Sequence, residues 1–280
     1  MNLVLQGLHP DRSAIEHIAM LAQAQRTVAL TPQAWRCEGV ADSSEVRAAV
    51  EAACLAAQLD GTFVAPGRTL NEFKLVTMDM DSTLITIECI DEIADMQGLK
   101  PQVAEITEAA MRGEIEFQES LTRRVALLKG LDAGALQRVY DERLKMSPGA
   151  ERMLEAVKAA GLKTLLVSGG FTFFTDRMKT RLGLDYTHSN VLEIENGKLT
   201  GKVVGGIVDA DEKQRTVERV CKDMGITPRQ AIVMGDGAND LKMMKVSGLS
   251  VAFRAKPIVR AQADVALNFV GLDGILALFD

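Results

Sequence analysis

Two carboxylates, Asp79 and Asp81, stand one residue apart where the apolar run at residues 73–78 ends. Alternate side chains of a strand share a face, so both carboxylates are expected to point into the same space beyond it. Two like charges this close repel each other, and a bound cation would offset that repulsion. In that setting Asp79 can act as a nucleophile toward phosphorus, and Asp81 can move protons to the leaving group and from water.

A second group of oxygen-bearing side chains follows another apolar run. The segment "GDGAND" at residues 235–240 supplies Asp236, Asn239 and Asp240. Mg²⁺ prefers hard oxygen ligands and is often shared with a substrate phosphate. If this segment lies beside Asp79 and Asp81, the carboxylates together predict a Mg²⁺ site, with Asp236 as the added ligand.

Two further features suit a phosphate group. The stretch "VSGG" offers the Ser168 hydroxyl and the backbone N–H groups around Gly169, where a helix is expected to begin. Lys213, at the head of a later helix, would add a fixed positive charge for phosphoryl transfer. Taken alone, a lysine in "DADEKQRT" is typical of a solvated helix, and paired aspartates also occur in surface turns. The order of the aspartate pair, Ser168, Lys213 and "GDGAND" along the chain favours a single site.

The elements that carry these residues alternate between strand and helix from residue 73 onward. Apolar runs end at Asp79, Ser168 and Asp236, and a fourth lies at 248–253. Helices are expected over residues 149–160, 171–182, 213–224 and 239–246. This alternation is typical of an α/β fold with a parallel sheet, in which ligands bind at the carboxyl ends of the strands.

Two insertions interrupt this core, and one further unit precedes it. Residues 86–146 have helical patterns and predict a helical cap inserted after the first strand. Asn196-Gly197, between alternating runs, predicts a type I′ hairpin within residues 190–204. Residues 1–66 predict a β-α-β-type unit with two amphipathic helices. The expected division is a small N-terminal α+β domain at 1–70 and a second domain at 71–280, with its core at 71–85 and 147–280.

Composition narrows the classes of partner. The 280 residues carry a net charge of −6, whereas a nucleic-acid partner would call for a basic excess. No apolar run approaches the roughly 20 residues that span a bilayer, and the N-terminus lacks the pattern of a signal peptide. The four cysteines are widely spaced, which predicts reduced thiols in a cytoplasmic protein. We therefore expect a small-molecule substrate, no nucleic acid and no membrane.

In order and spacing, "DMDST" (79–83), "SGG" (168–170), Lys213 and "GDGAND" (235–240) resemble the haloacid dehalogenase superfamily of phosphotransferases. The resemblance covers residues 73 to about 275. It implies a Rossmannoid core, a helical cap, Mg²⁺ and an aspartyl-phosphate intermediate. It also implies roles for individual residues: Asp79 as nucleophile, Asp81 as general acid and base, the Asp79 carboxylate, Asp81 carbonyl and Asp236 as metal ligands, Ser168, Gly169 and Lys213 as phosphate-binding positions, and Asn239 and Asp240 as supports for metal and phosphate.

Within that superfamily the cap resembles that of the phosphoserine phosphatases. The resemblance rests on Glu88 in "TIECIDEIA", on residues 109–131 and on "SPGA" at 147–150. It implies Glu88 and Arg124 as substrate-reading residues, with Met111 and Phe117 as apolar walls. The chemistry agrees, because Glu88 could accept an ammonium group and Arg124 could hold a carboxylate through two hydrogen bonds. The expected reaction is Mg²⁺-dependent hydrolysis of O-phospho-L-serine to L-serine and phosphate, the final step of serine biosynthesis.

The sequence leaves several alternatives open. Another small phosphate, such as phosphohomoserine, would use the same core, and a serine-sensing regulatory protein could keep the same fold. Arg123 stands beside Arg124, and one of the two is expected to face solvent. The N-terminal unit is compatible in pattern with the small-molecule-sensing ACT type. It would bind serine, form a homodimer or be a remnant.

Overall fold

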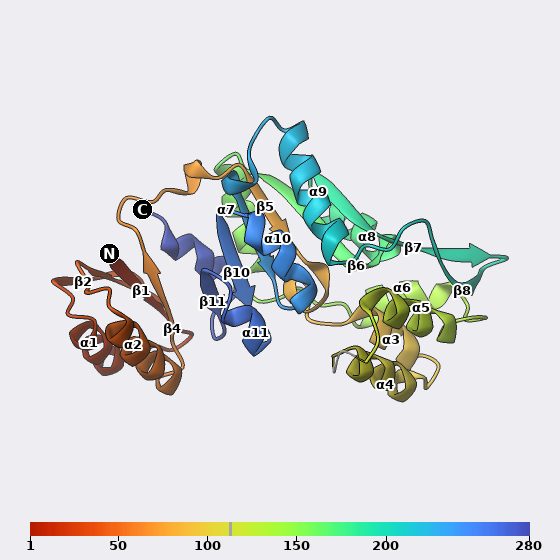
Figure 1. Cartoon of the computed structure of the whole chain (residues 1–280), viewed down its shortest axis with the longest axis horizontal. Coiled ribbons are helices and arrows are strands. Elements are labelled where there is room, and N and C mark those ends of the chain that lie inside the picture. The colour runs from red at the N-terminus through yellow and green to blue at the C-terminus, as the bar shows by residue number, and fades with distance from the viewer. Residues whose placement is uncertain (112–113) are drawn as a thin grey trace.

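The computed structural model describes residues 1–111 and 114–280. For Met111 it describes the backbone alone. The chain forms a small N-terminal unit, a large sheet flanked by helices, and a helical segment inserted between two strands of that sheet (Figure 1). The N-terminal unit and the helical segment lie at opposite ends of the molecule in this view.

The N-terminal unit is a four-stranded antiparallel sheet with two helices. Its strand order, β2-β3-β1-β4, is that of the βαββαβ arrangement. Its elements are β1 (Asn2–Gln6), α1 (Arg12–Leu21), β2 (Arg26–Thr31), β3 (Ala34–Glu38), α2 (Ser44–Ala56) and β4 (Asp60–Val64). Asp11 and Ser43 cap the two helices by accepting from backbone N–H groups of the first turn.

The β-α-β-type pattern expected for residues 1–66 omits strand β3, which pairs with both β1 and β2. Its sequence, "AWRCE", does not alternate cleanly because a cation occupies an inner position. The Arg36 guanidinium donates to the carbonyl oxygens of Ala277 and Phe279 at 3.3 and 2.8 Å. The strand itself is formed by backbone pairing with β1 and β2, and the Arg36 contact is a tertiary one that the local pattern does not contain.

The face of this sheet that carries Arg36 packs on the C-terminal end of the chain. Val4 and Val64 join the apolar core of the large sheet rather than the core beneath α1 and α2. The buried Asp60 carboxylate accepts hydrogen bonds from the backbone N–H groups of residues 268, 269 and 270 at 2.8, 2.9 and 3.0 Å. Apolar packing and buried polar contacts therefore both hold the N-terminal unit in place.

The large sheet has seven strands in the order β11-β10-β9-β5-β6-β7-β8. Neighbours are parallel except for the β7–β8 hairpin. The strands are β5 (Leu75–Met78), β6 (Lys163–Phe171), β7 (Tyr186–Glu195), β8 (Lys198–Val204), β9 (Ala231–Gly235), β10 (Leu249–Phe253) and β11 (Val265–Leu267). The expected parallel α/β core is present, and β11 is an additional edge strand.

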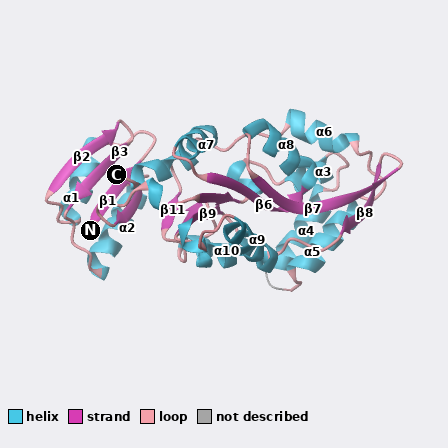
Figure 2. Cartoon of the chain, turned by 90° about the horizontal axis from the view of Figure 1, so that it is seen from above, coloured by secondary structure: helices cyan, strands magenta, loops and turns pink. Residues whose placement is uncertain are grey.

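Helices cover both faces of this sheet (Figure 2). Helices α7 (Ala150–Ala159) and α8 (Thr172–Leu182) pack on one face, and α9 (Ala210–Asp223) and α10 (Leu241–Val246) pack on the other. Among the described residues, the remaining short helices of this core are α11 (Pro257–Arg260), a π-helical turn at Met80–Leu84, and 3₁₀ turns at Leu70–Glu72, Pro228–Gln230, Ala238–Asp240 and Leu272–Leu278. Because both faces are covered, the central strands β5 and β9 are buried at every residue and mostly apolar.

The hairpin expected from Asn196-Gly197 is confirmed. Both residues have positive φ, 50° and 74°, as a two-residue type I′ loop requires. Strand β7 begins earlier than expected, at Tyr186, because its first residues pair with β6. The hairpin tip also leaves the sheet and reaches the helical segment, where the backbone N–H groups of Gly130 and Ala133 donate to residues 199 and 197, both at 2.8 Å.

The helical segment between β5 and α7 contains α3 (Cys89–Asp95), α4 (Lys100–Met111), α5 (Phe117–Leu127) and α6 (Gly134–Glu142). It leaves and rejoins the core at one place, where Ile85 and Met146 form an antiparallel bridge. Its inward-facing apolar residues, among them Ile93, Leu121 and Val139, are continuous with the core of the large sheet. The hairpin contact is a second backbone attachment, and the side chains of Gln118 and Gln137 also bind core residues, Asp209 and Arg177.

Candidate active site

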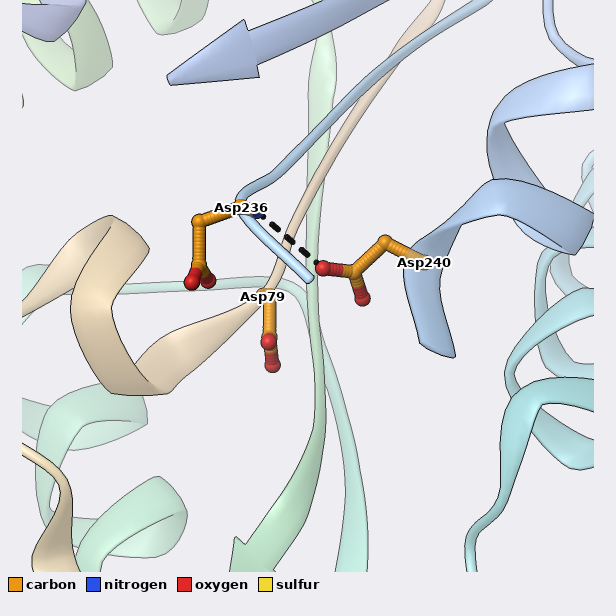
Figure 3. Close-up of side chains that lie close together, drawn as sticks. All are labelled: Asp79, Asp236 and Asp240. Carbon is orange, nitrogen blue, oxygen red and sulfur yellow. Dashed lines mark hydrogen bonds between the residues drawn. The ribbon is translucent and has the colours of Figure 1, made fainter. Parts of the chain in front are cut away.

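Three aspartates from two neighbouring strands meet at the carboxyl edge of the sheet (Figure 3). Asp79 follows β5, and Asp236 and Asp240 follow β9. One carboxylate oxygen of each lies within 4.8 Å of the other two. The backbone N–H of Asp236 donates to Asp240 Oδ2 at 3.2 Å, which closes the turn after β9. Three hard oxygen donors at this spacing fit the preferences of Mg²⁺.

Lys213 offsets part of this negative charge. Its side chain is fully buried, with Nζ 2.9 Å from Asp79 Oδ1 and 2.8 Å from Asp240 Oδ1. Even so, burial and then the charge of Asp240 raise the pKa of Asp79 well above its ordinary value. Burial, followed by the charge of Asp240, also raises the pKa of Asp236 to about 6. Both shifts reflect the cost of gathering carboxylates away from water, which a bound divalent cation would reduce.

Asp81 is held by a different set of partners. Its Oδ1 accepts from the backbone N–H of Cys89 at 2.7 Å, and its Oδ2 accepts from Ser168 Oγ at 3.3 Å. The chain turns here through Ser82, whose φ is 55°. Gly170 leaves the necessary space, because a Cβ at that position would lie 2.7 Å from Asp81 Oδ2. Burial raises the pKa of Asp81, which favours the protonated form that a general acid needs.

The group of three carboxylates differs in one member from the expected metal ligands. Asp79 and Asp236 belong to it, whereas Asp81 contributes no carboxylate oxygen. The metal contact expected of Asp81 was through its backbone carbonyl, so its side chain remains available for proton transfer. Asp240, expected as a supporting residue, contributes an oxygen to the group and also binds Lys213.

Ser168 and Gly169 lie at the end of β6, beside the aspartates. The Ser168 hydroxyl is fully buried and accepts from the backbone N–H of Gly170 at 2.8 Å. A Cβ on Gly169 would lie 3.2 Å from the ring of Phe117, so a glycine lets the helical segment approach this strand end closely. Together with Lys213, these residues offer a hydroxyl, backbone N–H groups and a cation to a phosphate.

A cavity of about 570 Å³ opens between this edge of the sheet and the helical segment. The expected site residues that line it are Asp79, Asp81, Glu88, Phe117, Arg124, Gly169, Asp236 and Asn239. Ser168, Lys213 and Asp240 are fully buried behind that lining. The expected role of Met111 falls on a side chain outside the described residues.

Glu88 and Arg124 stand on the helical side of the cavity. Arg123 pairs with Glu119 at 2.5 Å on the exposed face of α5, so Arg124 is the arginine of the pair that faces the cavity. Glu88 accepts a hydrogen bond from Ser82 Oγ at 2.6 Å. Burial, and then the charge of Asp81, raises the pKa of Glu88 to about 8.

Sequence reasoning missed several lining residues. Thr107 and Ala110 of α4 extend the helical wall, and Lys256 and Ile258 extend the core wall. Lys256 is joined to the site through its backbone N–H, which donates to the carbonyl of Asp236 at 3.1 Å. The sequence offered one local signal, Pro257, which marks the start of α11 and not a site.

Residues 73–248 match the model of the haloacid dehalogenase-like hydrolases, a span that includes every site residue described above except Lys256 and Ile258. This chain belongs to the haloacid dehalogenase-like hydrolase family. The resemblance inferred from the motifs is thereby confirmed. A second model, of a domain of unknown function, matches residues 3–50 in the N-terminal unit.

Relatives of this hydrolase include phosphoserine phosphatases, as the cap residues indicated. The phosphoserine phosphatase of a Polaromonas species is 59% identical over 218 residues, which are 76% of this chain and 92% of that protein. The phosphoserine phosphatase of Archaeoglobus fulgidus is 46% identical over 244 residues, 86% of this chain and 70% of that protein.

Solved structures place the hydrolase fold in the same family. A probable phosphoserine phosphatase from Vibrio cholerae, unliganded, is 35% identical with a TM-score of 0.85, over 99% of this chain and 86% of that one. A haloacid dehalogenase family hydrolase from Salmonella enterica serovar Typhi is 32% identical with a TM-score of 0.89, over 100% of this chain and 99% of that one. Among the described residues, none of the helices has the length and apolar character needed to cross a membrane.

Proposed function

We propose that this hydrolase is a phosphoserine phosphatase that converts O-phospho-L-serine and water to L-serine and phosphate. One observation carries the proposal. The buried Asp79 and the half-buried Asp81 line a cavity whose opposite wall presents a carboxylate, Glu88, and a guanidinium, Arg124. Phosphoserine carries a phosphate, an ammonium and a carboxylate, and the two walls together offer a complement to all three groups. The relatives named above support the same substrate.

In the first half of the reaction, an oxygen of Asp79 attacks phosphorus as the bond to the serine oxygen breaks. Asp81 gives its proton to the departing serine oxygen. The burial that raises the pKa of Asp81 supports this role. Ser168, the backbone around Gly169 and Lys213 hold the phosphoryl oxygens. Asp79 and Asp236, with the Asp81 carbonyl and the supporting Asp240, would hold Mg²⁺, which when bound neutralises charge on the phosphoryl group and on the carboxylates.

In the second half, water attacks phosphorus and the bond to Asp79 breaks. Asp81, now deprotonated, accepts a proton from that water, and phosphate leaves with Asp79 regenerated. The charge that remains at Asp79 is again compensated by Lys213, 2.9 Å away. Asp81 therefore acts in both halves, protonated in the first and deprotonated in the second, whereas Asp79 forms the bond to phosphorus and is then released.

Glu88 would receive the substrate ammonium and Arg124 its carboxylate, with Phe117 as an apolar wall over Gly169. Met111 is proposed as a second wall on the resemblance alone. Residues 86–146 would act as a cap that excludes water, a role supported by their contribution to the cavity lining. Asn239 also lines the cavity, where it would contact the phosphate.

The remaining parts of the proposal concern organisation. We divide the chain into a small α+β domain at 1–70 and a phosphatase domain at 71–280, with a core at 71–85 and 147–280. The βαββαβ arrangement supports an ACT-like assignment of the first domain. A homodimer through that domain would use its exposed strand β2 or its helices, since the other face of its sheet is covered. A cytoplasmic location remains part of the proposal, supported by four free cysteines.

Steady-state hydrolysis tests the function. Phosphoserine should be preferred over phosphohomoserine and over a sugar phosphate, and chelation of Mg²⁺ should abolish turnover. Asp79→Asn should lose on the order of 10³-fold or more in kcat, as expected for loss of a nucleophile. Asp211→Asn, which alters an exposed carboxylate paired with Lys242, should leave kcat unchanged. Retained activity in Asp79→Asn would refute the mechanism, and better turnover of another phosphate would refute the substrate.

A further inference from the structure

Strands β6 and β7 lose their regular pairing at the phosphate site. Their register runs continuously to Val167 and resumes only at Phe171, opposite Asn190. The interruption takes Ser168, Gly169 and Gly170 out of the regular ladder. Buried backbone groups that leave a ladder need other hydrogen-bond partners, because an unpaired buried carbonyl is costly.

The side chain of Asn190 supplies such a partner. It is buried, and its Nδ2 donates to the carbonyl oxygen of Gly169 at 2.7 Å. Its Oδ1 accepts from the backbone N–H of Val208 at 2.8 Å. Only the amide nitrogen can donate and only the amide oxygen can accept, so these two contacts fix the orientation of the side chain.

The first contact reaches the catalytic carboxylates through one peptide group. The Gly169 carbonyl and the Gly170 N–H belong to the same peptide, and that N–H donates to Ser168 Oγ at 2.8 Å. Asn190 and Ser168 therefore hold this peptide at its two ends. Because Ser168 Oγ accepts here, its own proton is directed to another acceptor, which is Asp81 Oδ2 at 3.3 Å or an incoming phosphate.

The second contact reaches the cation of the site. Val208 directly precedes Asp209, the N-cap of α9, and the backbone N–H of Lys213 donates to the Asp209 carbonyl at 2.9 Å. The loop that leads into α9 begins with Gly205 and Gly206, where an added Cβ would meet nothing within 4 Å. No atom of the described residues packs closely on the start of this loop, and the loop is hydrogen-bonded to the sheet where the Val208 N–H donates to Asn190.

We propose that Asn190 is a positioning residue that joins the two halves of the phosphate site, the end of β6 and the start of the helix carrying Lys213. It lies behind the site and acts through Gly169 and Val208, without touching substrate. The inference rests on the proposed phosphatase function. Asn190 positions the groups that bind the phosphate rather than those that bind the serine moiety. Its replacement must therefore slow the hydrolysis of every phosphate ester to the same extent.

The test compares Asn190→Leu and Asn190→Asp with the wild type on phosphoserine and on p-nitrophenyl phosphate. Leucine removes both hydrogen bonds at similar volume. Aspartate keeps an acceptor for Val208 but sets an oxygen against the Gly169 carbonyl. Both variants should lose on the order of 100-fold in kcat on both esters, the size expected for a small misplacement of reacting groups. Inhibition by inorganic phosphate should weaken, whereas the Mg²⁺ concentration for half-maximal rate should stay unchanged.

Thr175→Val is the matched control. Thr175 Oγ1 and Ser189 Oγ are 2.7 Å apart and buried, so this variant also removes a buried hydrogen bond beside Asn190. It should keep the wild-type kcat. Near-ultraviolet circular dichroism verifies folding, and if the leucine variant does not fold, the aspartate variant carries the test. The proposal would be overturned if the folded Asn190 variants kept the wild-type kcat. It would also be overturned if their kcat fell on phosphoserine alone, or if Thr175→Val lost as much kcat as they did.

If the wild type hydrolyses p-nitrophenyl phosphate but not phosphoserine, the substrate proposal fails. The positioning role is then decided on the artificial ester alone. If the wild type hydrolyses both esters and the Asn190 variants do so equally well, the positioning role fails and the proposed function stands.

Discussion

Replacing Lys213 with methionine would leave two buried carboxylates without the cation they share. Its ammonium lies 2.9 Å from Asp79 and 2.8 Å from Asp240, and all three side chains are buried. Methionine matches the length and apolar stem of lysine but carries no charge. The two aspartates must then take up protons or repel each other, and either response lowers the stability of the folded protein.

The size of the effect follows from burial. Removing one partner of a buried charge pair costs about 3–5 kcal/mol, because the remaining charge is left uncompensated in a poor solvent. For a domain of 150–250 residues, about 1 kcal/mol corresponds to about 2–4 °C in Tm. We therefore expect the Tm of metal-free Lys213→Met to fall by about 10 °C. Mg²⁺ should raise the Tm of this variant more than that of the wild type, since the ion would be its main counter-charge.

Thermal unfolding followed by circular dichroism, with chelator and with excess Mg²⁺, measures both effects. Lys242→Met serves as the control, because Lys242 pairs with Asp211 on the surface and such pairs contribute about 0–1 kcal/mol. Adding Asp240→Asn to Lys213→Met should recover part of the loss by removing one uncompensated charge. If metal-free Lys213→Met melted with the wild type, the carboxylates would not depend on Lys213, and the electrostatic account of the site would be wrong.

Three other changes probe separate parts of the molecule. Arg124→Ala should lower kcat/KM for phosphoserine roughly 10- to 100-fold, the worth of a charge-assisted hydrogen bond, while p-nitrophenyl phosphate is hydrolysed as before. The raised pKa of Glu88, about 8, means that the metal-free folded state holds this proton more tightly than the unfolded state does. The free energy of unfolding should therefore fall as pH rises from about 4.5 toward 8, and Glu88→Gln should flatten that slope in urea titrations. Asp60→Ala should cost at least about 3 kcal/mol in the same titrations, because it leaves three backbone N–H groups without the acceptor that Asp60→Asn would partly replace. An unchanged stability of Asp60→Ala would show that these hydrogen bonds do not help to hold the two units together.

The convergence of the core residues was predictable because it follows from topology. Asp79, Ser168 and Asp236 each end an apolar run, and in a parallel sheet such ends share one edge. Glu88 and Arg124 were named from the resemblance. The structure added the reason to prefer Arg124 over its neighbour, since Arg123 is occupied by Glu119 on the surface.

What escaped prediction depended on contacts between distant segments. Strand β3 pairs with β1 and β2, and its Arg36 contacts the C-terminal end of the chain, which no local pattern contains. Asn190 resembles any polar residue within a strand until the break in the β6–β7 ladder is seen. The start of α9 was missed for a different reason. Asp209 caps this helix by accepting from the backbone N–H of Glu212 at 2.9 Å. An Asp three residues before a Glu is a capping pattern that can be recognised in the sequence.

The β7–β8 hairpin restricts how the cavity can open. The helical segment is fixed to the sheet at the Ile85–Met146 bridge and again where residues 130–133 meet the hairpin tip. Two fixed points define a line, so any rigid displacement that preserves both sets of backbone hydrogen bonds is a rotation about that line. Withdrawal of the segment straight away from the sheet would require those bonds to break. A hairpin that supplies none of the described lining residues thus limits the rigid displacements that leave these backbone hydrogen bonds intact.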